Sequence, residues 1–344
     1  MDLPLWQWLA VFAGAAGILV WAGTRLAAAG DEIATKTGLG GLLVGALLTS
    51  AATSLPELVT DVSAVVNDAP SLAIGDLFGS SMANMAILAI IDLVARRRVW
   101  PTVELGHARV AAVAIVLTSL AVLGVVTPSG PAIGWIGLDT VAIAGIYVGA
   151  VAWFRRARGA ATVDPSGGVA VGSEIPTATG WSAAGGGGDV RPAAIRFGVA
   201  AAVVFAVGPV VAISGEGIAE TSGLGVTFVG AAFLAVATSL PELVASLAAV
   251  RIGAYDLAVG NLFGSNAVNM AMLVLIDAAY LDGPLLGAAG SVEIVAGVGA
   301  ILLMAVALAA VVHGEETRIY RLEPDAVLLL VAYVGAMVGV ATVG

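Results

Sequence analysis

The chain of 344 residues has no cysteine, a single lysine (Lys36) and only two histidines. Without cysteine it forms neither disulfides nor thiolate metal sites. Charged residues make up 11% of the sequence, where soluble domains carry about 25%. Hydrophobic residues make up 60%. This composition excludes a soluble globular domain and predicts a protein that crosses a lipid bilayer many times.

Ten apolar segments are long enough to cross the bilayer, for which a helix needs about 20 residues. They lie at about 5–24, 39–66, 71–94, 108–126, 132–154, 193–214, 223–250, 255–280, 288–312 and 325–343. The first has no basic stretch before it and no clear cleavage site, so we expect it to be retained as a span. The predicted fold class is therefore an all-α membrane protein with ten transmembrane helices.

The basic residues indicate the orientation of these helices. All 14 lysine and arginine residues fall in or beside alternate loops, while the opposite loops carry Asp68, Glu216, Glu220 and Asp282. Cytoplasmic loops are the ones enriched in lysine and arginine. We therefore expect a multi-pass protein of the cell membrane with both its N-terminus and its C-terminus outside.

The segment between the fifth and sixth spans differs in composition from the rest. Residues 155–192 are rich in glycine, serine, threonine and proline, which is typical of a flexible linker, here on the cytoplasmic side. This linker separates a first five-helix unit, residues 1–154, from a second five-helix unit, residues 193–344.

The two units are copies of one another. A shift of 185 residues carries Glu57 onto Glu242, and it carries GDLFGSSMANMAILAIID at 75–92 onto GNLFGSNAVNMAMLVLID at 260–277 without a gap. Because an odd number of spans precedes the second copy, its topology is inverted relative to the first. Inverted repeats of this kind are typical of secondary transporters.

The motif SLPEL occurs once in each copy, at 54–58 and 239–243. Pro56 lacks a backbone donor and crowds the preceding turn, so we expect the core helix to be broken there. Glu57 lies about 14 Å along the helix from the span's end, near the midplane of a core about 30 Å thick. A broken helix at this depth is tolerated where it lines a cavity, and a cation is one partner for the carbonyl groups that it frees.

The same letters also fit a capping box, with Ser54 as the N-cap and Glu57 at the third helical position. The two interpretations are compatible. Capping alone leaves Glu57 and Glu242 deep in the membrane, where ionisable side chains are costly and mark functional sites. We therefore expect both carboxylates to coordinate a cation.

Further polar residues follow the helical spacing of one face. They are Ser50, Thr53, Ser54 and Asp61 around Glu57, Thr238, Ser239 and Ser246 around Glu242, and Asp76, Ser80, Asn84, Asn261, Ser265 and Asn269 on the neighbouring spans. For Ser80 or Ser265 alone, contact between helices is an equally good interpretation. Together these oxygens suit calcium, and the two carboxylates would neutralise one divalent ion or be shared by several monovalent ions.

These motifs resemble those of the sodium/calcium exchanger family within the cation/calcium antiporter superfamily, over about 30–92 and 215–277. The resemblance implies that calcium lies between Glu57 and Glu242, assisted by the backbone of Thr53 and Thr238. It implies that sodium uses the same carboxylates with Ser54, Ser80, Ser239 and Ser265, and that Asn84 and Asn269 complete the central layer. Calcium and sodium are then transported ions and no cofactor is expected. One chain contains the whole site, so no protein partner or nucleic acid is implied.

Two positions depart from the family pattern. Relatives often carry aspartate at the position of Asn269, whose absence bears on stoichiometry and proton coupling. Asp76 stands where Asn261 stands in the second copy. It could add an acidic ligand or cap the third span, and we favour the cap.

The expected function is calcium/sodium antiport by alternating access, with the first and sixth spans as sliding elements, an assignment that leans on the resemblance. The main alternative is a proton/calcium exchanger, or an exchanger of another divalent cation, with the same fold. A cation channel is a further alternative. An intramembrane enzyme with a carboxylate dyad is disfavoured because no nucleophile or second catalytic element accompanies the glutamates.

Overall fold

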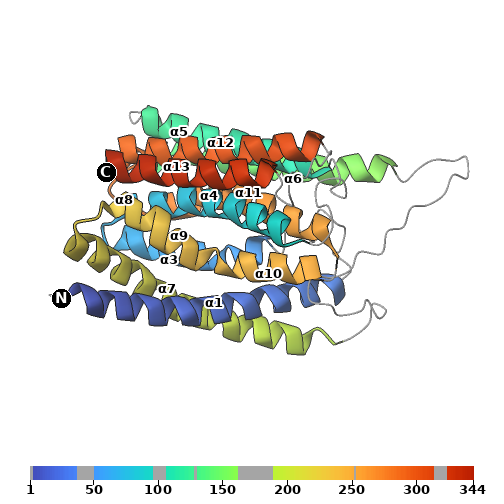
Figure 1. The fold of residues 1–344 in the computed structure, drawn as a ribbon, viewed down its shortest axis with the longest axis horizontal. Helices are drawn as coiled ribbons and strands as arrows, with labels where there is room; N and C mark the ends of the chain where they lie inside the picture. Colours follow the sequence, from blue (N-terminus) through green and yellow to red (C-terminus); the bar gives the residue numbers. More distant parts are fainter. Residues whose placement is uncertain are drawn as a thin grey trace, which may run out of the picture.

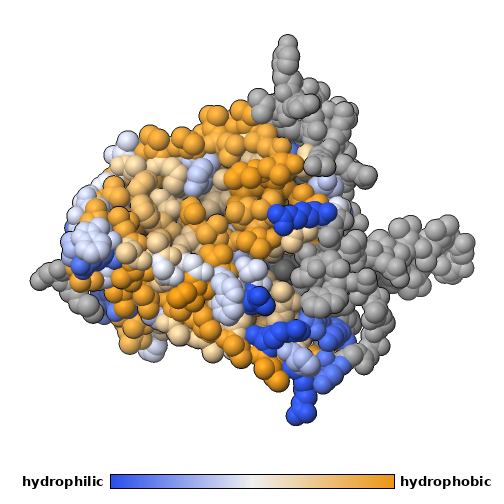
Figure 2. Space-filling view, turned by 60° about the horizontal axis from the view of Figure 1, so that its bottom comes forward, coloured by the Kyte–Doolittle hydropathy of each residue, from blue (hydrophilic) through white to orange (hydrophobic). Residues whose placement is uncertain are grey.

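The computed structural model describes residues 3–36, 50–95, 106–127, 130–161, 189–251, 253–313 and 324–344. Within these ranges the chain is a bundle of helices that lie side by side, with both termini at the same end (Figure 1). Figure 2 shows that hydrophobic residues cover the middle of the surface and that hydrophilic ones gather toward its ends. An apolar belt of this kind faces lipid, where helices satisfy their own backbone groups.

The elements of the first unit are α1 (Leu5–Lys36), α3 (Leu55–Val66), α4 (Pro70–Val94), α5 (Gly106–Val126), the strands β1 (Ala132–Ile133) and β2 (Ile136–Gly137), and α6 (Leu138–Ala161). The second unit contains α7 (Arg191–Ser222), α8 (Val226–Val229), the π-helical turn η2 (Gly230–Leu234), α9 (Ala235–Thr238), α10 (Leu240–Arg251), α11 (Tyr255–Ala279), the 3₁₀ turn η3 (Leu285–Ala288), α12 (Ser291–His313) and α13 (Pro324–Val343).

The predicted all-α membrane class is confirmed, whereas the count of ten spans is not. Among the described residues, seven helices are long and apolar enough to cross a membrane, or eight when α8–α9 and α10 form one bent span. Part of the second predicted span, 37–49, lies outside the described residues. The fifth predicted span begins too early, because a short antiparallel hairpin occupies 132–137 and α6 begins only at Leu138.

The predicted linker at 155–192 falls mostly outside the described residues, which stop at 161 and resume at 189. Its first residues continue α6 to Ala161, and its last two begin α7 at Arg191.

Two helices form the centre of the bundle. In α4 and α11, 83% of the most apolar window is buried, against 17% in α13. These are the helices that carry the long repeated motif, and they pack against each other and against α3 and α10. The motif that recurs in both units thus occupies the core, and helices such as α13 are more exposed at the surface.

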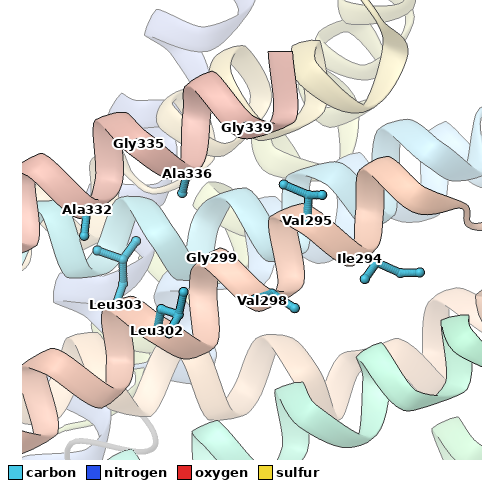
Figure 3. A pocket seen from close by; sticks show the side chains of 10 residues that line it. All are labelled: Ile294, Val295, Val298, Gly299, Leu302, Leu303, Ala332, Gly335, Ala336 and Gly339. Atoms are coloured by element: carbon cyan, nitrogen blue, oxygen red, sulfur yellow. The ribbon is translucent and has the colours of Figure 1, made fainter. Parts of the chain in front are cut away.

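An apolar groove of about 430 Å³ lies between α12 and α13 (Figure 3). Its lining consists of aliphatic side chains and glycines, among them Ile294, Leu302 and Gly335. It offers no side-chain oxygen to an ion and lies apart from the polar core.

Glycines allow α4 to approach the segment before the second break. A Cβ atom on Gly75 would lie 2.6 Å from the carbonyl oxygen of Thr227, and one on Gly79 would collide with the backbone of Ala231. Such backbone contact is the usual reason for glycine at membrane helix interfaces. It fixes the depth of α8, η2 and α9 against α4, and so positions the polar residues that follow.

The other packed pair is α1 with α7, which run along one side of the bundle (Figure 1). At the end where α1 leaves the membrane, Glu32 pairs with Lys36 at 2.8 Å and with Arg196 of α7. The hydrogen bond from Lys36 and the charge of Arg196 lower the pKa of Glu32. The pair therefore has an ionic link at this end in addition to its apolar contact.

Candidate cation-binding site

Each glutamate of the SLPEL motifs lies in the first turn of a helix that follows a break. In the second unit, the segment from α8 to α9 and the helix α10 meet at Ser239 with a bend of 42°. This bend confirms the predicted broken core helix in that unit. In the first unit Ser54 interrupts the helix before α3 with nearly the same backbone angles, φ −83° and ψ 3° against −84° and 0°. The prolines at 56 and 241 account for both breaks, because neither can donate to the preceding turn.

Glu57 and Glu242 are both fully buried and interact electrostatically with each other. Each also faces hydroxyl groups of the opposite unit: Glu57 lies beside Ser239, and Glu242 lies beside Thr53 and Ser54. The inverted repeats therefore bring the two motifs together at one place in the core, as the sequence predicts.

Hydrogen bonds link the neighbouring side chains to this centre. The Ser265 hydroxyl donates to Oε1 of Glu242 at 3.4 Å, and it shares a 3.4 Å hydrogen bond with the hydroxyl of Thr53. The Thr53 hydroxyl also lies 3.0 Å from the carbonyl oxygen of Ser50, to which it can donate. Ser265 thus joins α11 to both broken helices.

Several oxygens at this centre have no hydrogen-bond partner among the described residues. They are both carboxylate oxygens of Glu57, Oε2 of Glu242 and the hydroxyls of Ser54 and Ser239. Buried polar atoms are nearly always paired, because leaving one unpaired costs about 1–3 kcal/mol. A cluster of such oxygens, two of its groups being carboxylates, has the chemistry of a cation site.

The capping-box interpretation of Ser54 and Glu57 is wrong. Ser54 occupies the N-cap position of α3 but makes no side-chain capping hydrogen bond. With Pro56 at the second helical position, one of the donors that a cap would satisfy is missing. The Ser54 hydroxyl is therefore left for another ligand.

Ser80 and Thr238 form a second group with Asp76. The hydroxyls of Ser80 and Thr238 lie 3.4 Å apart, and Oδ1 of Asp76 accepts from Thr238 at 3.2 Å and from Ser80 at 3.4 Å. The expectation that Asp76 caps its helix is wrong, because α4 begins at Pro70 and its N-cap position is Ala69. Asp76 lies inside the helix and points its carboxylate into the polar core.

Beside Asn84 and Asn269 lies a third asparagine, Asn266, which the sequence analysis did not identify. Nδ2 of Asn84 donates to Oδ1 of Asn266 at 2.8 Å, and Nδ2 of Asn266 donates to the carbonyl oxygen of Ser81 at 3.2 Å. Asn266 therefore bridges α11 to α4. The shift of 185 residues aligns Asn266 with Ser81. This difference between the two copies, within a stretch that otherwise matches closely, is the feature of the sequence that could have pointed to Asn266. The side chain of Asn269 has no hydrogen-bond partner in the described part of the chain.

No three acidic or histidine side chains in the described ranges converge as a metal cluster. A cation at the centre would therefore be held by the two glutamates together with neutral hydroxyl, amide and carbonyl oxygens. Calcium accepts six to eight such ligands in flexible geometry, so this donor set fits it.

A bundle with inverted repeats, broken core helices and facing buried carboxylates defines the class of secondary cation transporters. The family described as "Sodium/calcium exchanger protein" matches residues 7–154 and 193–342. The chain belongs to this family of antiporters.

Curated relatives agree with this membership. The chain is 26% identical over 322 residues to the putative antiporter CaxA of Alkalimonas amylolytica, which covers 92% of this chain and 93% of the relative. It is 26% identical over 266 residues to the inner membrane protein YrbG of Escherichia coli, covering 77% and 78%. It is 43% identical to the sodium/calcium exchanger MaX1 of Methanosarcina acetivorans over 56 residues, 16% of each chain.

Solved structures show the same fold. The sodium-calcium exchanger NCX_Mj matches with a TM-score of 0.60 at 19% identity, over 97% of this chain and 99% of that chain. YfkE matches with a TM-score of 0.61 at 17% identity, over 96% and 91%.

The bridging role of Asn266 is testable by the Asn266→Ala substitution. We expect the free energy of unfolding to fall by about 1–3 kcal/mol, because the Ser81 carbonyl and the Asn84 amide lose a buried partner. Thermal or denaturant unfolding of the purified protein in detergent measures this loss. Asn67→Ala is the control, since Asn67 is exposed and bonds only within its own turn. Equal stability of the two variants would contradict the role.

Proposed function

We propose that the protein exchanges calcium for sodium across the membrane by alternating access. The observation that carries this proposal is the meeting of Glu57 and Glu242 from two broken helices, fully buried and with unpartnered oxygens. Two carboxylates neutralise one calcium ion, and the backbone of Thr53 and Thr238, which directly precede the breaks, supplies further hard ligands.

The case for sodium as the counter-ion rests on hydroxyl groups. Ser54 and Ser239 carry unpartnered buried hydroxyls beside the glutamates. The Ser265 hydroxyl contacts both Glu242 and Thr53, and the Ser80 hydroxyl contacts Thr238. Sodium uses these oxygens with the two carboxylates, while Asn84 and Asn269 complete the layer. Loading the site with one ion then expels the other. Exchange of calcium for protons with the same fold is the alternative.

The element proposed to slide is the pair of α1 and α7. A Cβ atom on Gly23 of α1 would lie 2.6 Å from Cγ of Pro241 and 3.2 Å from Cγ of Pro56, so α1 covers both breaks at once. Displacing α1 together with α7 would uncover the site toward one side at a time. No catalytic role is proposed for the glutamates, and no protein partner is needed to complete the site.

The choice between sodium and protons is tested with calcium-45 uptake into proteoliposomes. We expect uptake to follow an outward sodium gradient and not an outward proton gradient at matched membrane potential, because hydroxyl oxygens coordinate sodium. Vesicles without protein and vesicles with equal sodium on both sides are the controls. Uptake driven by protons alone would overturn the sodium assignment and leave the calcium site standing.

The two central carboxylates are tested by Glu57→Gln and Glu242→Gln. We expect calcium uptake to fall at least about 100-fold in each variant, because removing one partner of a buried charged site costs about 3–5 kcal/mol. Glu220→Gln, which changes an exposed glutamate in α7, is the matched control and should transport normally. Undiminished transport by both central variants would eliminate this site.

The proposed orientation, with both termini outside and the central linker cytoplasmic, is testable because the chain has no cysteine. A membrane-impermeant maleimide applied to intact cells should label Asp282→Cys, whereas Arg251→Cys should react only after permeabilisation. Both positions are exposed, and the cysteine-free parent gives the background. The reverse labelling pattern would show the opposite orientation.

A further inference from the structure

The polar core contains two carboxylates beyond the central pair. Asp61 lies one helical turn after Glu57 in α3, and Asp76 lies in α4, which packs against α3. Both side chains are fully buried. The Asp61 carboxylate faces that of Asp76 closely enough for direct interaction, and Glu57 and Asp76 also interact electrostatically.

The hydrogen bonds of this pair are incomplete. Oδ1 of Asp76 accepts from Thr238 and Ser80. Oδ2 of Asp76 and both carboxylate oxygens of Asp61 have no hydrogen-bond donor among the described residues. The Asp61 side chain is thus an unpartnered, buried acid directed at the group formed by Asp76 and its two hydroxyl donors.

The second unit carries a neutral pair at the same two positions, joined by a hydrogen bond, although Oδ1 of Asn261 has no partner among the described residues. The shift of 185 residues carries Asp61 onto Ser246 and Asp76 onto Asn261. There Nδ2 of Asn261 donates to the Ser246 hydroxyl at 3.3 Å. Each position can therefore hold a neutral residue, and in the first unit both neutral residues are replaced by acids. Packing does not require this exchange.

Two buried carboxylates that face each other are unfavourable when both are ionised, and either a shared proton or a bound cation would remove this cost. An uncompensated buried charge costs several kcal/mol, and the mutual repulsion of the pair adds to this cost. Lysine and arginine do not supply the charge, because the salt bridges of the described residues lie at the helix ends. The available oxygens are two carboxylates and the hydroxyls of Ser80 and Thr238. These side chains offer fewer oxygens than the six to eight that calcium takes, so a monovalent ion fits this set better.

We propose that Asp61 and Asp76 form a monovalent-cation site beside the central glutamates, for which sodium is the probe, and that this site shares the hydroxyls of Ser80 and Thr238 with the sodium-binding residues proposed above. The site is present in the first unit alone. It lies on the side of Glu57 that leads toward the end of α3 at Val66, whereas the neutral pair lies on the side of Glu242 that leads toward Arg251. The two sides of the polar core therefore differ in the acidic residues that they carry.

The first experiment detects sodium binding at this site by thermal stability and does not require transport. In the Glu57→Gln/Glu242→Gln background, thermal unfolding in detergent is followed in sodium chloride against choline chloride at equal ionic strength. We expect the melting temperature to rise with sodium. Adding Asp61→Asn and Asp76→Asn should abolish the rise or move its midpoint at least about tenfold higher in sodium. Glu293→Gln is the control, since it removes a buried carboxylate that bonds Thr227 and the Gly290 backbone.

A second variant is needed in case the quadruple variant does not fold. Asp61→Ser/Asp76→Asn in the wild-type background introduces the neutral pair with which the other unit folds, and it should lose one class of sodium site in equilibrium binding of sodium-22. Sodium stabilisation that survives removal of both aspartates, or that is absent from the glutamate double variant, would overturn the proposal. Because no calcium movement is measured, failure of the proposed exchange activity would leave this result standing.

Discussion

The structure depends on keeping two carboxylates, those of Glu57 and Glu242, beside each other in a fully buried core. Like charges repel more strongly in a medium of low dielectric constant than in water, so this arrangement is unfavourable when both carboxylates are ionised and no cation lies between them. The breaks at Ser54 and Ser239 and the hydroxyls from opposite units all converge on this pair. The polar core thus gives up intrinsic stability at the place where we propose that a cation binds.

The remaining architecture holds that core in register. Glycines bring α4 into backbone contact with the segment before the second break, and Asn266 and Ser265 of α11 tie the two units together by hydrogen bonds. Membrane helices gain little from apolar burial against each other, so such contacts carry much of the association.

Much of this was predictable from the sequence because the repeat is gapless. Aligning Glu57 with Glu242 is enough to predict the inverted topology, the core helices and the central residues, because all three follow from the register of the two copies. The hairpin at 132–137 was not predictable, since AIGWIG is as apolar as a span. The prediction that Asp76 caps its helix was wrong because it considered only neighbouring residues in the sequence. The Asp76 carboxylate is instead oriented by hydrogen bonds from Thr238, in the other unit, and from Ser80, one helical turn away. Contacts between units, such as that of Asn266 with Asn84, require tertiary structure.

Gly23 carries a consequence for how the two halves can act. Both prolines approach this one position of α1, so a single helix covers the two breaks. A helix that touches both cannot release one break while remaining unchanged at the other. The two half-sites therefore share one cover, so a displacement of α1 changes the surroundings of both breaks together.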